Sequence, residues 1–291
     1  ASCASLLLEP QTQNLVTYSE DFSQWSTLSA NAATYVSDLV NPDGSIGGYK
    51  VSGSGIYLGT SLLTTTQRSI YARSVSGSGA VQLMTHNSNT NNVFTLTEEW
   101  QRFDLNSVTS STGSYYFYID LRGASTTLSE LYVWGAQATN DQSYVTSYIP
   151  SNSGSTTTRT ADVCNGAGTS ATFNDSEGVL FAEIAALADD GTNRRISISN
   201  GTTSDNDRIN LMYTATSNQV VINYKASGTT RVSFDTTLND ITNFNKVAML
   251  FKSGDFKFYV NGYLIDTDNN TNMIANGTLS ELAFEDATNS N

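Results

Sequence analysis

The feature that most restricts the fold of this chain is its scarcity of charged side chains. Asp, Glu, Lys and Arg make up 14% of the 291 residues, whereas an average globular chain carries about 25%. Long surface helices need such residues on their solvated side, and here too few are present. Thr, Val and Tyr recur throughout the chain, and they fit the pleated, half-buried surface of a sheet. The composition therefore predicts an all-β protein.

Charge and hydropathy exclude two kinds of partner. The formal net charge is −13, so the phosphate backbone of a nucleic acid would repel the chain. No apolar run approaches the roughly 20 residues that span a bilayer, and we expect no membrane insertion. Aromatic residues make up 10% of the chain, which argues against a disordered protein.

The scarcity of histidine and cysteine in the sequence argues against most kinds of catalytic site. His86 is the one histidine, so a single chain cannot build a histidine metal cluster. A Ser-His-Asp triad would need His86, which lies in the polar run 86–92 that we interpret as a loop. Cys3 and Cys164 lie far apart in the sequence. They are compatible with a disulfide, with two free thiols or with buried, unreactive side chains.

Short strands are predicted along both halves of the chain. Runs that alternate apolar and polar residues are separated by Gly, Ser and Asn turns, a pattern typical of β-sandwiches. The Asn261-Gly262 pair predicts a type I′ hairpin between two such runs. The other predicted strands are 56–58, 69–75, 80–85, 92–97, 101–108, 115–121 and 128–136, then 178–186, 195–199, 208–214, 219–225, 230–235 and 246–252.

A polar seam near the middle of the chain predicts its domain boundaries. The length suggests two domains of about 150 residues each. Pro150 is followed by a run rich in Ser and Thr, which is typical of a linker. Because a sandwich usually ends on a closing strand, we also expect the second domain to be truncated. The expected divisions are a connector at 1–13, a sandwich at 14–150, a linker at 151–163 and a second sandwich at 164–291.

The first half resembles a module of bacteriophage tail and head fibre proteins. The resemblance begins with the lead-in 6–10, the motif NLVTYSEDF at 14–22 and Trp25. It continues with LYVWGAQ at 131–137, YVTSYIP at 144–150 and TRTAD at 158–162, and covers roughly residues 5–163. This module is similar to the jelly-roll fold of carbohydrate-binding modules. The resemblance implies a jelly-roll domain in which Trp25 is a structural anchor.

The second half resembles a concanavalin/laminin-G-like lectin domain. The match runs from the KVAM motif at 246–249 to the FYVNG hairpin at 258–262. Hydrolases of this fold carry Glu-x-Asp-x-x-Glu or a close variant on a short strand, and we find no such pattern. Glu183 has no second acid nearby, so the paired carboxylates of a glycosidase are missing. The expectation is a non-enzymatic protein.

Strand alternation predicts a candidate glycan-binding face in the first domain. In each of four predicted strands, one set of alternating residues is apolar and suits the core. The opposite set combines aromatic rings with hydrogen-bonding groups, which suits the apolar faces and hydroxyls of sugars. Alternatively, these aromatic residues pack under a loop or against the second domain. The candidate residues are Tyr71, Arg73, Tyr116, Tyr118, Arg122, Tyr132 and Trp134.

Two acidic segments are candidate calcium sites. Glu20 and Asp21 resemble positions that bind structural calcium in some jelly-roll modules. Asp266 and Asp268 alternate in a polar segment, and carboxylate oxygens at such spacing are ligands that Ca²⁺ accepts. Solvated turn aspartates are the alternative interpretation, and no cofactor is required.

The sequence as a whole predicts a non-enzymatic phage fibre or spike protein, located on the virion and outside the cell. The expected partners are host-surface glycans and other virion proteins, and the resemblance implies a homotrimer. One alternative is a secreted bacterial adhesin or the binding modules of a polysaccharide-degrading enzyme. A second alternative is a virion decoration protein with no ligand.

Overall fold

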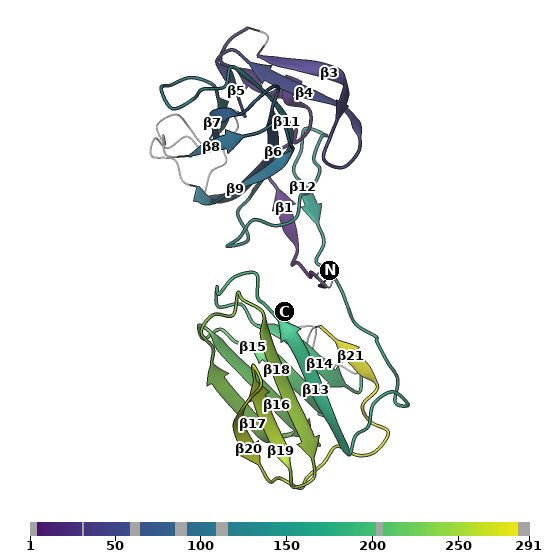
Figure 1. Cartoon of the computed structure of the whole chain (residues 1–291). Helices are drawn as coiled ribbons and strands as arrows, with labels where there is room; N and C mark the ends of the chain where they lie inside the picture. The colour runs from purple at the N-terminus through teal and green to yellow at the C-terminus, as the bar shows by residue number, and fades with distance from the viewer. Residues whose placement is uncertain are drawn as a thin grey trace. The chain divides into compact units, whose positions relative to one another are not determined.

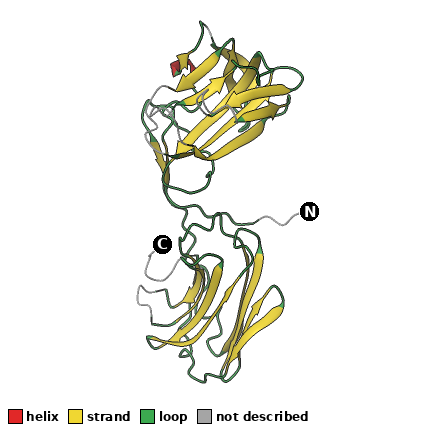
Figure 2. Cartoon of the chain, turned by 90° about the vertical axis from the view of Figure 1, so that its left-hand side faces the viewer, coloured by secondary structure: helices red, strands yellow, loops and turns green. Residues whose placement is uncertain are grey.

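The protein is built almost entirely of strands and loops. The computed structural model describes residues 5–30, 32–58, 65–84, 92–108, 116–201 and 206–284. Within these residues the one helix is η1 (Phe22–Gln24), a single 3-10 turn (Figures 1 and 2). The chain divides into two compact units, residues 1–162 and 163–291. The predicted all-β class with two tandem β-sandwiches is thereby confirmed.

Unit 1 contains two five-stranded sheets and one small two-stranded sheet. The β10 sheet has the order β2 (Ser26–Thr27), β5 (Gly55–Leu58), β10 (Phe117–Asp120), β7 (Gly79–Leu83) and β8 (Val93–Leu96). The β11 sheet has the order β3 (Ala33–Val40), β4 (Ile46–Ser52), β11 (Glu130–Thr139), β6 (Thr66–Ser74) and β9 (Gln101–Val108). The small sheet pairs β1 (Thr12–Asn14) with β12 (Thr157–Arg159).

The core of unit 1 lies between the β10 and β11 sheets. Ile70 and Val133 come from the β11 sheet, whereas Val81 and Ile119 come from the β10 sheet, and all four are fully buried in one cluster. Trp25 is buried there as well, with 3% of its surface exposed. Its indole N–H donates to the Tyr18 carbonyl at 2.8 Å, which fits the predicted anchor role.

One cation lies inside this core. Arg68 is 1% exposed, and its guanidinium lies 5.5 Å from the centre of the Phe117 ring. It donates to the backbone carbonyls of Met84 and Tyr116 and to the Thr66 hydroxyl. Burial lowers the pKa of Arg68 to about 9, because a charge inside the protein loses its hydration. Arg68 therefore connects β6 to the ends of β7 and β10.

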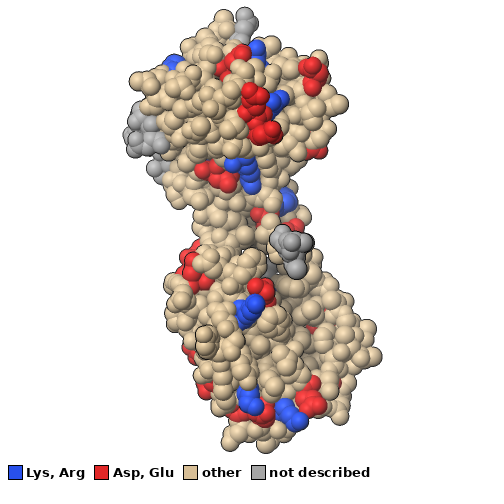
Figure 3. Space-filling view, in the orientation of Figure 1, with Lys and Arg blue, Asp and Glu red and all other residues tan. Residues whose placement is uncertain are grey.

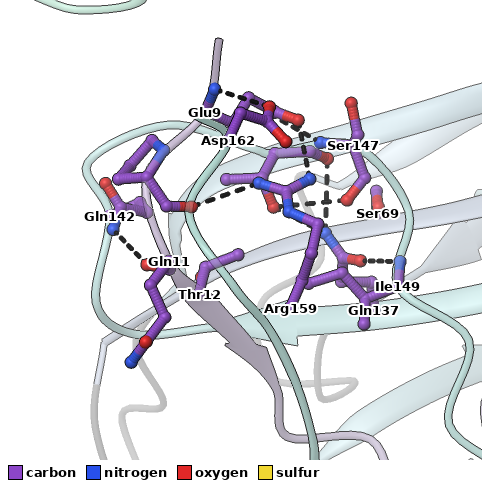
Figure 4. Close-up of polar contacts among 12 residues, drawn as sticks. Glu9, Gln11, Thr12, Ser69, Gln137, Gln142, Ser147, Ile149, Arg159 and Asp162 are labelled. Carbon is purple, nitrogen blue, oxygen red and sulfur yellow. Dashed lines mark hydrogen bonds and ion pairs between the residues drawn. The ribbon is translucent and has the colours of Figure 1, made fainter. Parts of the chain in front are cut away.

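A polar network joins the two ends of unit 1. The Arg159 guanidinium donates to the Glu9 carboxylate at 2.7 Å, and the Ser147 amide donates to the same carboxylate at 2.9 Å. The Glu9 amide in turn donates to the Asp162 carboxylate at 2.9 Å (Figure 4). We call these four residues the terminal clasp. Because Glu9 is 6% exposed, the clasp is a largely buried ion pair.

The terminal clasp changes the expected boundaries of the first domain. We expected a connector at 1–13 and a linker at 151–163. The structure instead pairs β1 with β12 and assigns the chain as far as Asp162 to unit 1. The run after Pro150 is rich in turn formers, yet Ser151 is 2% exposed and packed against the domain. Composition alone does not reveal such long-range pairing.

Unit 2 is a sandwich of a five-stranded and a four-stranded sheet. The β15 sheet has the order β17 (Thr229–Thr237), β16 (Gln219–Ala226), β15 (Arg208–Tyr213), β14 (Arg194–Ser199) and β21 (Glu281–Ala283). The β18 sheet has the order β13 (Glu177–Ile184), β18 (Asn245–Lys252), β19 (Phe256–Val260) and β20 (Tyr263–Asp268). All strand pairs within these two sheets are antiparallel.

Alternating side chains build the core of unit 2. Every second residue of β16 and β19 is buried, and Ile222, Phe234, Met249 and Phe258 belong to one cluster between the sheets. The predicted Asn261-Gly262 hairpin is confirmed, because both residues have the positive φ angles of a type I′ turn, 51° and 86°. No helix among the described residues is long and apolar enough to cross a membrane.

Candidate functional site

The residues predicted to share one binding face lie on two different sheets. One group lies on the β11 sheet and consists of Tyr71, Arg73, Tyr132 and Trp134. The other lies on or next to β10 and consists of Tyr116, Tyr118 and Arg122. The two sheets enclose the core between them, so their outer faces point in opposite directions. The prediction of one shared face is therefore wrong. Alternation separates inward from outward residues but does not assign a strand to a sheet.

The group on the β10 sheet is a tight tyrosine cluster. Tyr57 of β5 lies directly opposite Tyr118 of β10, and their rings stack with centroids 4.8 Å apart. Tyr116 packs edge-on against both rings at 5.5 Å. Tyr118 is only 7% exposed, and burial raises the pKa of its phenol. These rings mainly pack against one another.

Arg122 is held by an ion pair next to this cluster. Its guanidinium donates twice to the Asp120 carboxylate, each time at 2.9 Å. The Asp120 side chain is 1% exposed. The hydrogen bond between Arg122 and this carboxylate raises the pKa of Arg122. Two of the hydrogen-bond donors of the Arg122 guanidinium are therefore used by Asp120 at the end of β10.

The β11 group is covered at one end by the segment that follows β11. Tyr148 packs against Trp134 with ring centroids 4.7 Å apart, and Trp134 is 6% exposed. Tyr71 contacts the other side of Trp134 at 5.4 Å. The Gln137 side-chain amide donates to Thr146 at 3.1 Å, which fixes the covering segment. For Trp134 the alternative interpretation, packing under a loop, describes the structure.

The other end of the β11 sheet presents a half-buried arginine between two aromatic rings. The Arg73 guanidinium lies 4.7 Å from the centre of the Tyr132 ring and 5.4 Å from the Trp100 ring. It donates to the Glu98 carbonyl at 3.1 Å. The Trp100 indole donates to the Val40 carbonyl at 2.9 Å, which fixes the orientation of its ring. Arg73, Tyr132 and Trp100 are all partly exposed.

An ion pair extends this arrangement across the sheet. Lys50 of β4 lies directly opposite Tyr132 and donates to Glu130 at 2.9 Å. That hydrogen bond raises the pKa of the Lys50 ammonium. Lys50, Tyr132, Arg73 and Trp100 therefore form a row that crosses β4, β11 and β6 and ends just before β9, which we call the Tyr132 row. It combines two flat rings with two cations and places a carboxylate next to them.

Sequence reasoning found only half of this row. Tyr132 and Arg73 belong to strands with clear alternation, whereas Trp100 precedes β9 and Lys50 lies on β4, which was not predicted as a strand. The available signal was a tryptophan at the start of the predicted strand 101–108. The pairing of β4 with β11, which places Lys50 in the row, is a tertiary contact.

The predicted calcium ligands are hydrogen-bonded to groups of the protein. Glu20 accepts hydrogen bonds from the Tyr148 hydroxyl and the Asn152 amide. Asp21 accepts from the Ser23 hydroxyl and the Tyr49 hydroxyl at 2.6 and 2.7 Å. Among the described residues, no group of three or more His, Cys, Asp or Glu side chains could hold a metal ion.

The second predicted pair accepts hydrogen bonds from nearby backbone N–H groups. Asp266 accepts the backbone N–H of Thr267, and Asp268 accepts that of Asn270, at 2.8 and 2.7 Å. The Asp268 bond, two residues along the chain, is the arrangement by which an aspartate stabilises its own turn, whereas Asp266 lies in the interior of β20.

The remaining candidate residues do not belong to the Tyr132 row or fall outside the described residues. His86 and Cys3 are outside the described residues, and Cys164 is half-buried in unit 2. Glu183 is exposed on β13, directly opposite Lys246 of β18. The sequence predicted neither a triad nor a carboxylate pair.

Comparisons with known proteins give a weak structural likeness. No protein family model matches the chain, and no curated protein matches it. Among solved structures, a native glycosidic hydrolase is similar at 17% identity and a TM-score of 0.31, over 50% of this chain and 62% of the hydrolase. The chain thus spans less than two thirds of that protein.

Two further solved structures are similar to the chain at comparable scores. Sheep galectin-11 in complex with glycerol is similar at 14% identity over 36% of this chain and 77% of the galectin, with a TM-score of 0.26. Domains LG4-5 of the mouse laminin α1 chain are similar at 8% identity over 89% of this chain and 86% of that one, with a TM-score of 0.29. At these TM-scores nothing about the fold or function of this chain follows from the likeness.

Proposed function

We propose that the chain is a non-enzymatic binding protein whose first unit binds glycans through the Tyr132 row. The observation that carries the proposal is the arrangement of Tyr132, Arg73 and Trp100. An arginine lies over two aromatic rings, and all three side chains remain partly exposed. Aromatic rings provide flat apolar surface, and charged groups provide strong hydrogen bonds. A pyranose ring, with its apolar face and its ring of hydroxyls, matches both.

The row is suited to a sugar chain lying on the surface. Lys50 of β4 and Arg73 of β6 are the cross-strand neighbours of Tyr132, and Lys50 pairs with Glu130 of β11. Hydroxyls of a sugar stacked on Tyr132 would therefore find both donors and an acceptor within the same row. Because the row crosses neighbouring strands, it offers contacts to more than one sugar unit. An extended polysaccharide fits this geometry better than a small molecule does.

We further propose that the protein is part of a phage fibre or spike, on the virion and outside the cell. The support is the resemblance of residues 14–22, 131–137 and 144–150 to a fibre module. The proposed partners are host-surface glycans and neighbouring virion proteins. A surface solvated by neutral hydroxyls and amides would suit a particle that meets varied salt, because salt screens charged surfaces most.

A glycan array probed with the full chain tests the proposal. We expect binding to a set of bacterial surface polysaccharides, and loss of that binding in Trp100→Ala. The matched control is Tyr263→Ala, which removes an aromatic ring that is 75% exposed in unit 2. Absence of any signal from the folded wild-type chain would contradict glycan binding. Equal signals from the wild type and Trp100→Ala would exclude the Tyr132 row as the site.

A further inference from the structure

We propose that a second copy of this chain docks on the outer face of the β18 sheet in unit 2. The core-facing residues of β13 and β18, such as Leu180 and Met249, are buried. The alternate residues form the outer face, and they include Val179 and Phe181 of β13. This inference is independent of the Tyr132 row, which belongs to unit 1.

The centre of this face is apolar and exposed. Val179 and Phe181 are 59% and 58% exposed. Their cross-strand neighbours on β18 are Leu250 and Ala248, which are partly exposed. Isolated exposed apolar residues are common, but four that adjoin one another on one face of a sheet are typical of an interaction surface.

Opposite charges lie at both ends of the apolar centre. At one end Glu177 of β13 forms an ion pair with Lys252 of β18 at 2.9 Å. At the other end Glu183 of β13 lies directly opposite Lys246 of β18. In Figure 3, neighbouring red and blue residues lie above and below an uncharged stretch on the side of unit 2 that carries β13 and β18 in Figure 1. Each end thus has its acid on β13 and its base on β18.

Two copies of this face complement each other in charge when they are related by one particular two-fold axis. An axis parallel to the strands, between β13 and β18, places β13 of each copy over β18 of the other. Glu183 then faces the partner subunit's Lys246, and Phe181 faces the small side chain of the partner subunit's Ala248. An axis across the strands would instead bring Glu183 over the partner subunit's Glu177. Like charges at an interface suppress that alternative.

The proposed contact is compact. Sheets that pack face to face keep their strands within about 30° of each other, and an axis parallel to the strands produces this aligned packing. Two strands of eight residues cover roughly 10 Å by 26 Å. That area is below the about 800 Å² that each partner buries in a standard interface. We therefore expect a weak dimer, populated at high protein concentration.

Sedimentation equilibrium of the full chain over a concentration series tests this. The wild-type mass should rise from that of one chain, 31.3 kDa, towards twice that value. Phe181→Ser should raise the dissociation constant at least tenfold. The matched control Ile46→Ser, at a residue 70% exposed in unit 1, should leave it unchanged. A wild-type mass that stays at one chain, or equal effects of the two variants, would overturn the proposal.

A charge exchange tests the orientation. Glu183→Lys places like charges across the interface and should weaken the dimer, and addition of Lys246→Glu in the same chain should restore it. Thermal unfolding of each variant monitors the fold separately. Restoration identifies the axis parallel to the strands. If the double variant remains as weak as the single one, the proposed orientation is wrong.

Discussion

At the scale of single residues, a few buried polar groups fix the first unit. The Glu9 carboxylate contacts Arg159 and Ser147, which come from parts of the chain far from it in sequence. Removal of such a group is strongly destabilising, because the charged partner then remains buried without an opposite charge. Nothing in the local sequence around Glu9 marks this role, since both partners meet it only in the folded unit.

Glu9→Ala should lower the free energy of unfolding of unit 1 by about 3 kcal/mol, because it leaves the Arg159 guanidinium unpaired. Glu130→Ala is the matched control. It breaks the more exposed ion pair with Lys50 and should cost less than about 1 kcal/mol. Urea unfolding followed by fluorescence measures both. Equal losses of unfolding free energy would show that the terminal clasp stabilises unit 1 no more than an exposed ion pair does.

Asp21 gives unit 1 a dependence on acid pH. Burial works to raise the pKa of its carboxyl, but hydrogen bonds from Ser23, Tyr49 and Gln24 outweigh it, and the pKa lies below its ordinary value of 3.8. A depressed pKa stabilises the fold above the pKa of the unfolded chain, and that contribution is lost as the pH falls through the folded value.

Asp21→Asn should therefore be less stable than the wild type at pH 6, and the difference should shrink below a pH of about 4. Melting temperatures recorded between pH 2 and 7 measure it. A difference that is constant over this range would mean that the hydrogen bonds do not favour the charged carboxylate.

At the scale of strands, alternation was the signal that could be read from the sequence. It located β6, β9, β16, β18 and β19 close to their observed bounds. It missed β3, because in that strand most residues on both faces are exposed and the apolar period is weak. The pairing of β3 and β4 with the rest of the sheet is a long-range contact, and the Tyr132 row depends on it.

Two Asn-Gly pairs show where turn signals succeed and fail. Asn261-Gly262 connects β19 and β20 in the predicted two-residue hairpin. The sequence also contains an Asn200-Gly201 pair, which favours a two-residue hairpin in the same way. However, β14 ends at Ser199 and its partner β15 begins at Arg208, so that loop is longer. Gly201 has a positive φ angle of 69°, but the flanking strands decide the loop length.

Gly262→Val should destabilise unit 2 by about 2 kcal/mol, because the φ angle of 86° is strained for a branched residue. Gly262→Asn is the matched control, since Asn tolerates this conformation, and it should cost less than about 1 kcal/mol. A Cβ at this position would meet no atom within 4 Å, so packing does not complicate the comparison. Chemical unfolding measures the difference, and equal effects would contradict the turn assignment.

At the scale of the whole molecule, two sandwiches present outer faces of different character. The composition predicted the fold class, because too little charge was available for solvated helices. It did not predict which outward residues share a sheet, so the candidate site had to be divided between two faces. The Tyr132 row in unit 1 is polar and aromatic, whereas the exposed centre of the β18 sheet in unit 2 is apolar. The first suits a sugar chain and the second suits another protein surface.

The central claim is that the Tyr132 row binds glycans, and isothermal titration of the full chain tests it most directly. The titrant is the polysaccharide that gives the strongest array signal. We predict that Tyr132→Ala weakens binding at least tenfold, about 1.4 kcal/mol, while Tyr263→Ala binds like the wild type and both variants keep their melting temperature. Binding by Tyr132→Ala at the wild-type affinity would contradict the account.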